Sequence, residues 1–148
     1  MATLSFSVVD ATNADVVYAL QNQCQEHPWS EANFRSSLRS PYFPFAVTID
    51  DVVVGYYFGH QVLSDITLID IGVSPNYRGQ GIGKAMVEHL SQQALSRNAQ
   101  EIWLEVRVSN ATAIKLYQQA DFEVIETRKD YYQSAAGKED AFVMGKVL

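Results

Sequence analysis

The sequence predicts a single α/β domain, residues 1–148, with a mixed and mostly antiparallel β-sheet and helices on both faces. Apolar segments typical of strands alternate with segments of helical spacing in the order β-α-α-β-β-β-α-β-α-β-β. Three consecutive strands indicate an antiparallel meander, whereas a strand, a long helix and another strand indicate a parallel crossover. A chain of 148 residues, 47% of them apolar, suits one domain with one core.

The first half of the chain is expected to supply one strand, two helices and a β-hairpin. Leu4–Ala11 is typical of a short strand, and the segment after it of a helix that Thr12 caps. Ser30 is expected to cap a second helix. Two β-rich runs then flank Asp50 and Asp51, a pattern that predicts a hairpin.

The second half is expected to supply the parallel crossover. Its strands are Ile66–Val73 and Glu101–Val108, joined by a helix over Ile82–Ala99. A short helix capped by Asn110 follows, and two closing strands are joined by the turn QSAAGK. The apolar stripe of the long helix consists of Ile82, Met86, Leu90 and Ala94, widened by Val87 and Leu95.

Composition and charge argue against several function classes. The net charge of −6 argues weakly against direct nucleic-acid binding and for a cationic partner. The longest uncharged stretch, Val52–Ser64, is too short to span a bilayer, which needs roughly 20 apolar residues. Cys24 is the only cysteine, which favours a reducing, cytoplasmic compartment. The three histidines lack metal-ligand spacing, so no metal is expected.

A glycine-rich segment, RGQGIG, lies at the junction between a predicted strand and the long helix. Backbone N–H groups at a helix start favour an anion, and glycine lets the backbone approach a phosphate. The P-loop pattern fails because it would begin at Arg78 and because Ala85 follows Lys84. The dinucleotide pattern fails because Lys84 or Met86 occupies its last glycine position. Residues 78–83 fit a third pattern, Q/R-x-x-G-x-G/A, without a mismatch.

Between this strand and this helix, the segment resembles the coenzyme A pyrophosphate loop of the GNAT family of N-acetyltransferases. PWSEANF, WLEVRVSNATAIKLYQQADF and YYQSAAGKEDAFVM resemble one branch of it, the bacterial ribosomal-protein-alanine N-acetyltransferases, over roughly Asp10–Met144. One departure is Asp121, which replaces a glycine at the exit of the last helix. The resemblance implies an acyltransferase that uses acetyl-CoA as co-substrate. It also implies, as partner, the basic N-terminal peptide of a small-subunit ribosomal protein, acetylated on its N-terminal alanine.

The resemblance further implies which residues hold the cofactor. Ile71 and Val73 are expected to offer backbone groups to the pantetheine arm, and Gly72 between them suggests a bulge that opens the strand. Asn110 is expected both to cap its helix and to bind the cofactor. The pyrophosphate is expected to lie on Arg78, Gly79, Gln80, Gly81, Ile82, Gly83 and Lys84.

Glu105 and Tyr117 are the expected catalytic residues, acting by direct attack in a ternary complex. Glu105 lies in the middle of a predicted strand and matches the branch's proton acceptor; the alternative is an ion pair with Arg107 on the same face. Tyr117 matches the proton donor to the departing thiolate; the alternative is a core aromatic of an amphipathic helix. Cys24 is interpreted as a core thiol rather than a nucleophile.

Two questions stay open at this stage. The acceptor surface is one, because the acidic residues are interpreted either as contacts for a cationic peptide or as a solvated rim. They are Glu26, Glu31, Asp65, Asp70 and Asp130, with Tyr131 and Tyr132 as candidates for a peptide groove. The activity is the other: an acetyltransferase of the same fold that acts on a small amine or a lysine side chain, or a non-catalytic acyl-CoA-binding module.

Overall fold

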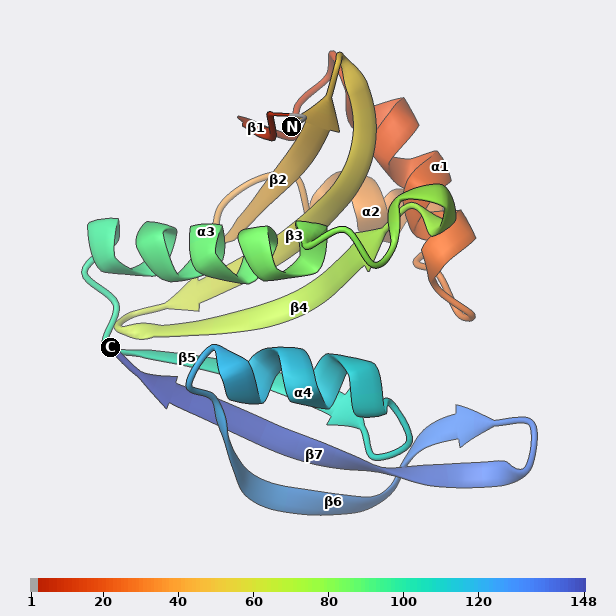
Figure 1. Cartoon of the computed structure of the whole chain (residues 1–148), viewed down its shortest axis with the longest axis vertical. Helices are drawn as coiled ribbons and strands as arrows, with labels where there is room; N and C mark the ends of the chain where they lie inside the picture. The colour runs from red at the N-terminus through yellow and green to blue at the C-terminus, as the bar shows by residue number, and fades with distance from the viewer. Residues whose placement is uncertain (1–2) are drawn as a thin grey trace. The chain divides into compact units, whose positions relative to one another are not determined.

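Strands and helices follow the predicted order in the computed structural model, which describes residues 3–148 (Figure 1). The elements are β1 Ser5–Val8, α1 Ala14–Cys24, α2 Glu31–Ser36, β2 Tyr42–Ile49, β3 Val52–Val62, β4 Asp65–Val73, α3 Ile82–Ser96, β5 Glu101–Arg107, α4 Ala111–Gln119, β6 Glu123–Ser134 and β7 Gly137–Val147. A short 3-10 helix, Pro75–Tyr77, is additional. The strands form one mixed sheet in the hydrogen-bonded order β1-β2-β3-β4-β5-β7-β6.

Internal contacts divide the chain into two compact units. Unit 1 contains the residues up to Gln61 together with Ile69–Met86, and unit 2 contains Val62–Leu68 together with Val87–Leu148. Strand β4 therefore contributes its first half to unit 2 and its second half to unit 1. The single-domain organisation stays a prediction.

The predicted hairpin of unit 1 is confirmed. Strands β2 and β3 pair in antiparallel register, from Ile49 opposite Val52 onward. The two turn residues, Asp50 and Asp51, have φ angles of 49° and 65°. A two-residue hairpin turn with positive φ at both positions matches the right-handed twist of its strands, and aspartate tolerates this conformation.

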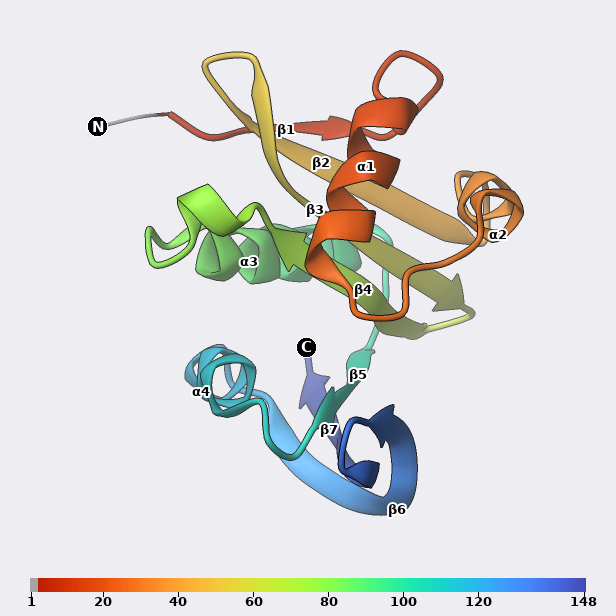
Figure 2. The ribbon, with the colours of Figure 1, turned by 90° about the vertical axis from the view of Figure 1, so that its right-hand side faces the viewer.

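Helices cover both faces of the unit 1 strands, as neighbouring residues of β3 show. A Cβ at Gly55 would lie 3.2 Å from the sulfur of Met86, in the first turns of α3. The next residue, Tyr56, is fully buried on the opposite face, where α1 and α2 lie (Figure 2). The core on this face consists of Val9, Ala14, Val17, Leu20, Phe34, Ala46, Tyr56 and Phe58.

One of the two predicted caps in unit 1 is confirmed. Ser30 accepts a hydrogen bond from the backbone N–H of Asn33 at 3.1 Å, as an N-cap does. Thr12 is wrong as a cap, because its N–H and hydroxyl both donate to Asp10. Asp10 forms a turn with the residues before the helix. The N-cap residue is therefore Asn13, one position after Thr12, and α1 begins at Ala14.

Unit 2 contains the predicted parallel pair, but over only four residues of each strand. Asp65–Leu68 pairs with Glu101–Leu104, and the parallel pairing of β4 with β5 does not continue beyond Leu68 and Leu104. Strand β5 also pairs antiparallel with β7, and β7 with β6 (Figure 1). Two register shifts interrupt the β6–β7 pairing, one after Val124 and one after Arg128.

The helices of the second half agree with the sequence pattern except at one position. The stripe Ile82, Met86, Leu90 and Ala94 is buried, as is Val87. Leu95 is 61% exposed, although its neighbour Ala94 in the last turn of α3 is buried, so the buried stripe is narrower there than predicted. Asn110 caps α4 as predicted, accepting from the N–H of Ala113 at 3.1 Å. None of the helices in residues 3–148 is both long and apolar enough to cross a membrane.

Candidate active site

Two glycines shape the predicted pyrophosphate loop in unit 1. Gly79 and Gly81 have φ angles of 77° and 81°, which L side chains rarely adopt. A Cβ at either position would meet no atom within 4 Å, so the conformation and not the space requires glycine. The loop leads into α3 at Ile82, and the first N–H groups of a helix have no acceptor within it. This geometry suits an anion.

The remaining residues of the loop divide into exposed and buried ones. Arg78, Gln80 and Lys84 are exposed, so their side chains are available to a ligand. Ile82 is 2% exposed, which means that its side chain belongs to the core and only its backbone can serve a ligand. The guanidinium of Arg78 also donates to the carbonyl of Val73 at 3.2 Å, which ties the loop to the end of β4.

The predicted pantetheine-binding residues lie at the end of β4, also in unit 1. Both backbone groups of Ile71 already have partners: its N–H donates to Asp70 at 2.9 Å, and its carbonyl accepts from Gln25 at 3.2 Å. The carbonyl of Val73 accepts from the thiol of Cys24 at 3.3 Å. A ligand that pairs with this part of β4 therefore replaces bonds to the chain's own side chains.

Gly72 has a packing reason for being glycine. A Cβ there would lie 2.6 Å from the ring of Tyr56 and 2.9 Å from Cys24, closer than real contacts allow. β4 continues through Gly72 as one strand from Asp65 to Val73. The structure shows close approach of α1 and β3 at this position, and the suggested bulge stays a prediction.

Asp70, which the sequence left between a solvated rim and an acceptor contact, is the centre of a polar network. Its carboxylate accepts hydrogen bonds from Gln21 of α1 and from Gln25, the residue after α1, both at 2.7 Å. It also accepts from the Tyr56 hydroxyl at 3.0 Å and from the N–H of Ile71. Burial raises the pKa of Asp70 to about 6, against the opposing effect of these hydrogen bonds. Gln21 is 0% exposed. The feature of the sequence that indicates this network is the four-residue spacing of Gln21 and Gln25, which places both side chains on one side of a helix.

Glu105 lies on β5 in unit 2, and one of its two carboxylate oxygens has an ion-pair partner. Its neighbours along the strand, Leu104 and Val106, are buried on the opposite face. Its side chain is 29% exposed, and Oε1 lies 3.6 Å from the guanidinium of Arg128. Its Oε2 is buried and accepts no hydrogen bond from residues 3–148. An acceptor oxygen is thus available to an N–H donor.

The alternative ion pair between Glu105 and Arg107 is wrong. Arg107 pairs instead with Glu139, 3.4 Å away, and donates to the carbonyl of Gln133 at 2.8 Å. Glu139 also accepts from the N–H of Ser109 at 2.8 Å. This ion pair therefore holds the segment between β5 and α4 against β7 and leaves Glu105 to other partners.

Two tyrosines of β6 lie beside Glu105. A hydrogen bond to Glu105 raises the pKa of Tyr131, and some burial and the carboxylate charge add to this effect. Burial, followed by the charge of Glu105, raises the pKa of Tyr132 to about 12. Arg107 lies over the ring of Tyr132 at 4.5 Å and Arg128 over that of Tyr131 at 5.7 Å. Both phenols therefore stay protonated at neutral pH and can donate hydrogen bonds.

Tyr117 and Asn110 occupy the two ends of α4 in unit 2. Tyr117 is 5% exposed and its ring lies 5.9 Å from that of Phe122. It therefore has the packing of a core aromatic, and its role as proton donor stays a prediction. Asn110 uses its side-chain oxygen as a cap, which leaves the amide N–H groups for a ligand. Asp121, after this helix, has a φ of 70° and takes the conformation that a glycine would supply.

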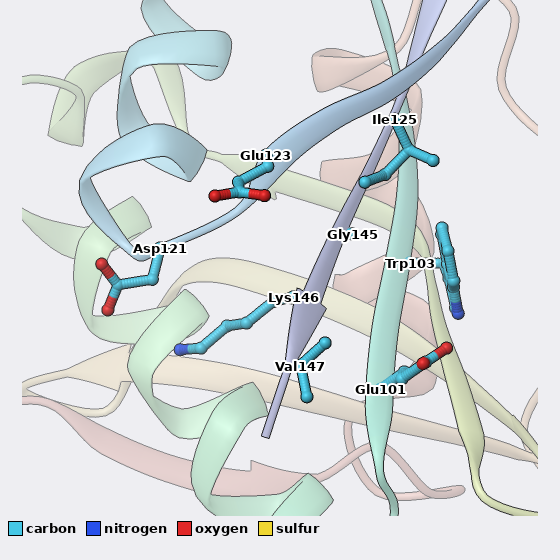
Figure 3. Close-up of a pocket in the computed structure, with 8 residues that line it drawn as sticks. All are labelled: Glu101, Trp103, Asp121, Glu123, Ile125, Gly145, Lys146 and Val147. Carbon is cyan, nitrogen blue, oxygen red and sulfur yellow. The ribbon is translucent and has the colours of Figure 1, made fainter.

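Residues 3–148 form neither a metal site nor a site with a reactive thiol. No group of three or more metal-ligating side chains occurs there. Burial raises the pKa of the Cys24 thiol, which keeps it protonated and a poor nucleophile. A pocket of about 320 Å³ in unit 2 contains none of the predicted site residues (Figure 3). It is lined by Glu101, Trp103, Asp121, Glu123, Ile125, Gly145, Lys146 and Val147.

Comparison with known proteins agrees with this geometry. The model of the acetyltransferase (GNAT) family matches residues 14–122, which include the glycine loop, Glu105 and Tyr117. The chain belongs to the GNAT family of acetyltransferases. The predicted family and fold class are thereby confirmed.

Individual relatives match nearly the whole chain. The ribosomal protein bS18-alanine N-acetyltransferase of Escherichia coli strain K12 is 35% identical over 140 residues, 95% of each chain. The crystal structure of the E. coli ribosomal-protein-S18-alanine N-acetyltransferase has a TM-score of 0.93 and 34% identity, covering 98% of this chain and 94% of that one. Arabidopsis thaliana NAA60 in complex with acetyl-CoA has the same fold, with a TM-score of 0.89, 15% identity and 99% coverage of both chains.

Replacing Asp70 with Asn is expected to change how stability depends on pH. Burial raises the pKa of Asp70 from 3.8 to about 6, so the folded chain keeps a proton that the unfolded chain releases between these values. The free energy of unfolding of the wild type should therefore fall, relative to Asp70→Asn, as pH rises from about 4 to about 6. The full effect is at most about 3 kcal/mol, from roughly two pKa units.

Urea unfolding at pH 4, 5, 6 and 7 measures this difference. Asp65→Asn is the matched control, since Asp65 is an exposed aspartate of the same strand. If the difference in the free energy of unfolding between the wild type and Asp70→Asn stays constant over this pH range, Asp70 is not a buried group that titrates there.

Proposed function

We propose that the chain is an acetyl-CoA-dependent N-α-acetyltransferase that acetylates the N-terminal alanine of a small-subunit ribosomal protein. The observation that carries this proposal is the 35% identity, over 95% of both chains, to an enzyme named for alanine acetylation of ribosomal protein bS18. The net charge of −6 supports it, because an acidic chain suits the basic N-terminal peptide that we propose as acceptor. The proposal places the chain with its substrate in the cytoplasm, without direct contact to nucleic acid or membrane.

The glycine loop supports acetyl-CoA as the co-substrate. The positive φ angles of Gly79 and Gly81 and the N-terminus of α3 suit the pyrophosphate, with Arg78 and Lys84 as exposed cations beside it. Gln80, Ile82 and Gly83 complete the loop. Ile71, Gly72 and Val73 would serve the pantetheine arm through the backbone, and Asn110 through its amide. When bound, acetyl-CoA supplies the acetyl group as a thioester.

An N-terminal amine suits a modest base. Its pKa lies near 7.7–8.0, against about 10.4 for lysine, so at neutral pH its deprotonation costs roughly 3 kcal/mol less. Glu105 would accept the proton, directly or through water, at its buried Oε2. Tyr131 and Tyr132 are candidates to line the acceptor groove beside it.

Tyr117 would donate the proton that the departing thiolate needs. Its burial on α4 keeps the ring in one place and excludes water around it. With Glu105 as base, this arrangement needs no acyl-enzyme and no metal: the amine nitrogen attacks the thioester carbonyl, the C–S bond breaks, and the two protein groups move one proton each.

Replacing Gly81 with Ala is expected to weaken acetyl-CoA binding about tenfold. An L residue at a φ of 81° costs about 1–2 kcal/mol, which the loop avoids by moving its amides. Isothermal titration calorimetry with acetyl-CoA measures the Kd. Gly83→Ala is the matched control: Gly83 lies inside α3, and the loop pattern admits alanine there, so its Kd should stay within about threefold. Equal losses in both variants would contradict the assigned role of the loop.

Replacing Glu105 with Gln is expected to reduce kcat by roughly 10²–10⁴-fold, the usual contribution of a general base. The Kd for acetyl-CoA should stay nearly unchanged, because glutamine keeps the shape of the side chain. Glu126→Gln, which removes the other carboxylate near Arg128, is the control and should retain activity. A parallel loss of acetyl-CoA binding in Glu105→Gln would mean that Glu105 is structural.

Two synthetic peptides test the acceptor. One begins with free alanine followed by a basic sequence, and the other has the same sequence with a blocked N-terminus and a lysine available. Release of free CoA is followed for each. Turnover of the free-alanine peptide alone is the expected result. Turnover of the blocked peptide would favour a lysine acetyltransferase, and turnover of neither would remove the peptide acceptor while leaving the family assignment in place.

A further inference from the structure

The Asp70 network joins three elements of unit 1. Gln21 lies in α1, Gln25 is the residue directly after it, and Tyr56 belongs to β3. The amide of Gln25 lies within hydrogen-bond distance of Asp70, of the Tyr56 hydroxyl and of the Ile71 carbonyl. The carboxylate is therefore the point through which the end of α1 is attached to β4.

The direction of the hydrogen bonds favours the ionised form of Asp70, since among its partners only the Tyr56 hydroxyl can also accept from a neutral carboxyl group. Gln21, Gln25, Tyr56 and the N–H of Ile71 all donate to the carboxylate. A neutral carboxyl group carries a hydrogen of its own, which would face these donors, so protonation breaks at least one of the bonds. The attachment of α1 to β4 thus depends on the charge of a single group.

The segment that follows α1 is fixed at both of its ends. At the start, Gln25 is held by the Asp70 network. At the far end, the Tyr18 hydroxyl donates to the carbonyl of Trp29 at 3.0 Å, and the Trp29 ring packs edge-on against Phe58 at 4.9 Å. Between these ends Glu26 and His27 are exposed. We call residues 26–30 the α1–α2 loop.

We propose that Asp70 is a positioning residue for the acceptor: its carboxylate holds Gln25 and thereby fixes the α1–α2 loop against which the cationic peptide docks. The inference rests on the proposed function, since it needs a peptide acceptor. Charge supports the docking part, because the exposed carboxylates of Glu26 and Glu31 lie in and directly after this loop. Asp70 acts through Gln25 and need not touch the substrate.

The titratable groups around Asp70 leave it as the one expected to change charge near pH 6. Tyr56, on β3, has its pKa raised by burial and by the Asp70 charge, so it stays neutral. Cys24, on α1, has its pKa raised by burial and also stays neutral. Arg78, after β4, keeps its charge. Burial puts the pKa of Asp70 itself at about 6.

The test compares the full chain with Asp70→Asn over a range of pH, using the free-alanine basic peptide and acetyl-CoA. At pH 7.5 the variant should have an approximately tenfold higher KM for the peptide. The kcat should stay within about threefold. The ratio of the two peptide KM values, variant over wild type, should fall toward 1 as pH drops through about 6, because the wild type then loses its charge. The ratio cancels the titration of the peptide amine, which is common to both proteins.

Two further variants keep the test decisive. Gln25→Ala removes the link between Asp70 and the α1–α2 loop, and should raise the peptide KM about threefold or more. Gln23→Ala replaces an exposed glutamine of the same helix and should change nothing. A peptide KM ratio that is 1 at pH 7.5, or that does not vary with pH, overturns the proposal. So does an unchanged KM in Gln25→Ala, including the case in which Asp70→Asn does not fold.

Amide hydrogen exchange gives a readout that does not depend on activity. Exchange of residues 26–30, followed by mass spectrometry at pH 7, should be about tenfold faster in Asp70→Asn and unchanged in Gln23→Ala. Unchanged exchange in Asp70→Asn contradicts the positioning role. If the wild type turns over neither peptide, the proposed function fails, and faster exchange would still establish that Asp70 holds the loop.

Discussion

The short parallel pairing between β4 and β5 is the constraint on which the candidate site depends. It ends at Leu68 and Leu104, four residues into each strand. The residues of β4 and β5 to which we assign chemistry come after this point: Glu105 is the next residue of β5, and Asp70 to Val73 follow on β4. Backbone groups that have lost a strand partner need others. On β4 the chain supplies them from its own side chains, with Asp70 and Gln25 at Ile71.

Local patterns predicted the elements well wherever one short-range interaction determines the structure. The stripe Ile82, Met86, Leu90 and Ala94 of α3 and the caps Ser30 and Asn110 each depend on residues within one to four turns of a helix, and each is confirmed. Thr12 failed because two local motifs compete there, and Asp10 forms the turn first. The exposure of Leu95 could not be predicted, since it depends on where the core ends.

The candidate site divides in the same way. The glycine pattern predicted the loop because Gly79 and Gly81 are the residues that adopt its positive φ angles. The residues visible in the sequence are thus the ones that determine the conformation. The Asp70 network joins residues that are 14 to 49 positions apart in the sequence. The sequence around Asp70 does not indicate that Gln21 and Gln25 donate to it. The partners of Glu105 belong to the same category, because Arg128 reaches it across the sheet from β6.

The two register shifts of β6 have a consequence for the behaviour of the chain at high concentration. β6 is the last strand of the sheet and is exposed along most of its length. A long, flat edge strand can pair with the same strand of another molecule and start aggregation. The shifts interrupt the regular spacing of its backbone groups, and Glu126, Arg128 and Lys129 place charges along it. The irregularity that brings Arg128 and Tyr131 to Glu105 thus also makes β6 a poor template for a second molecule.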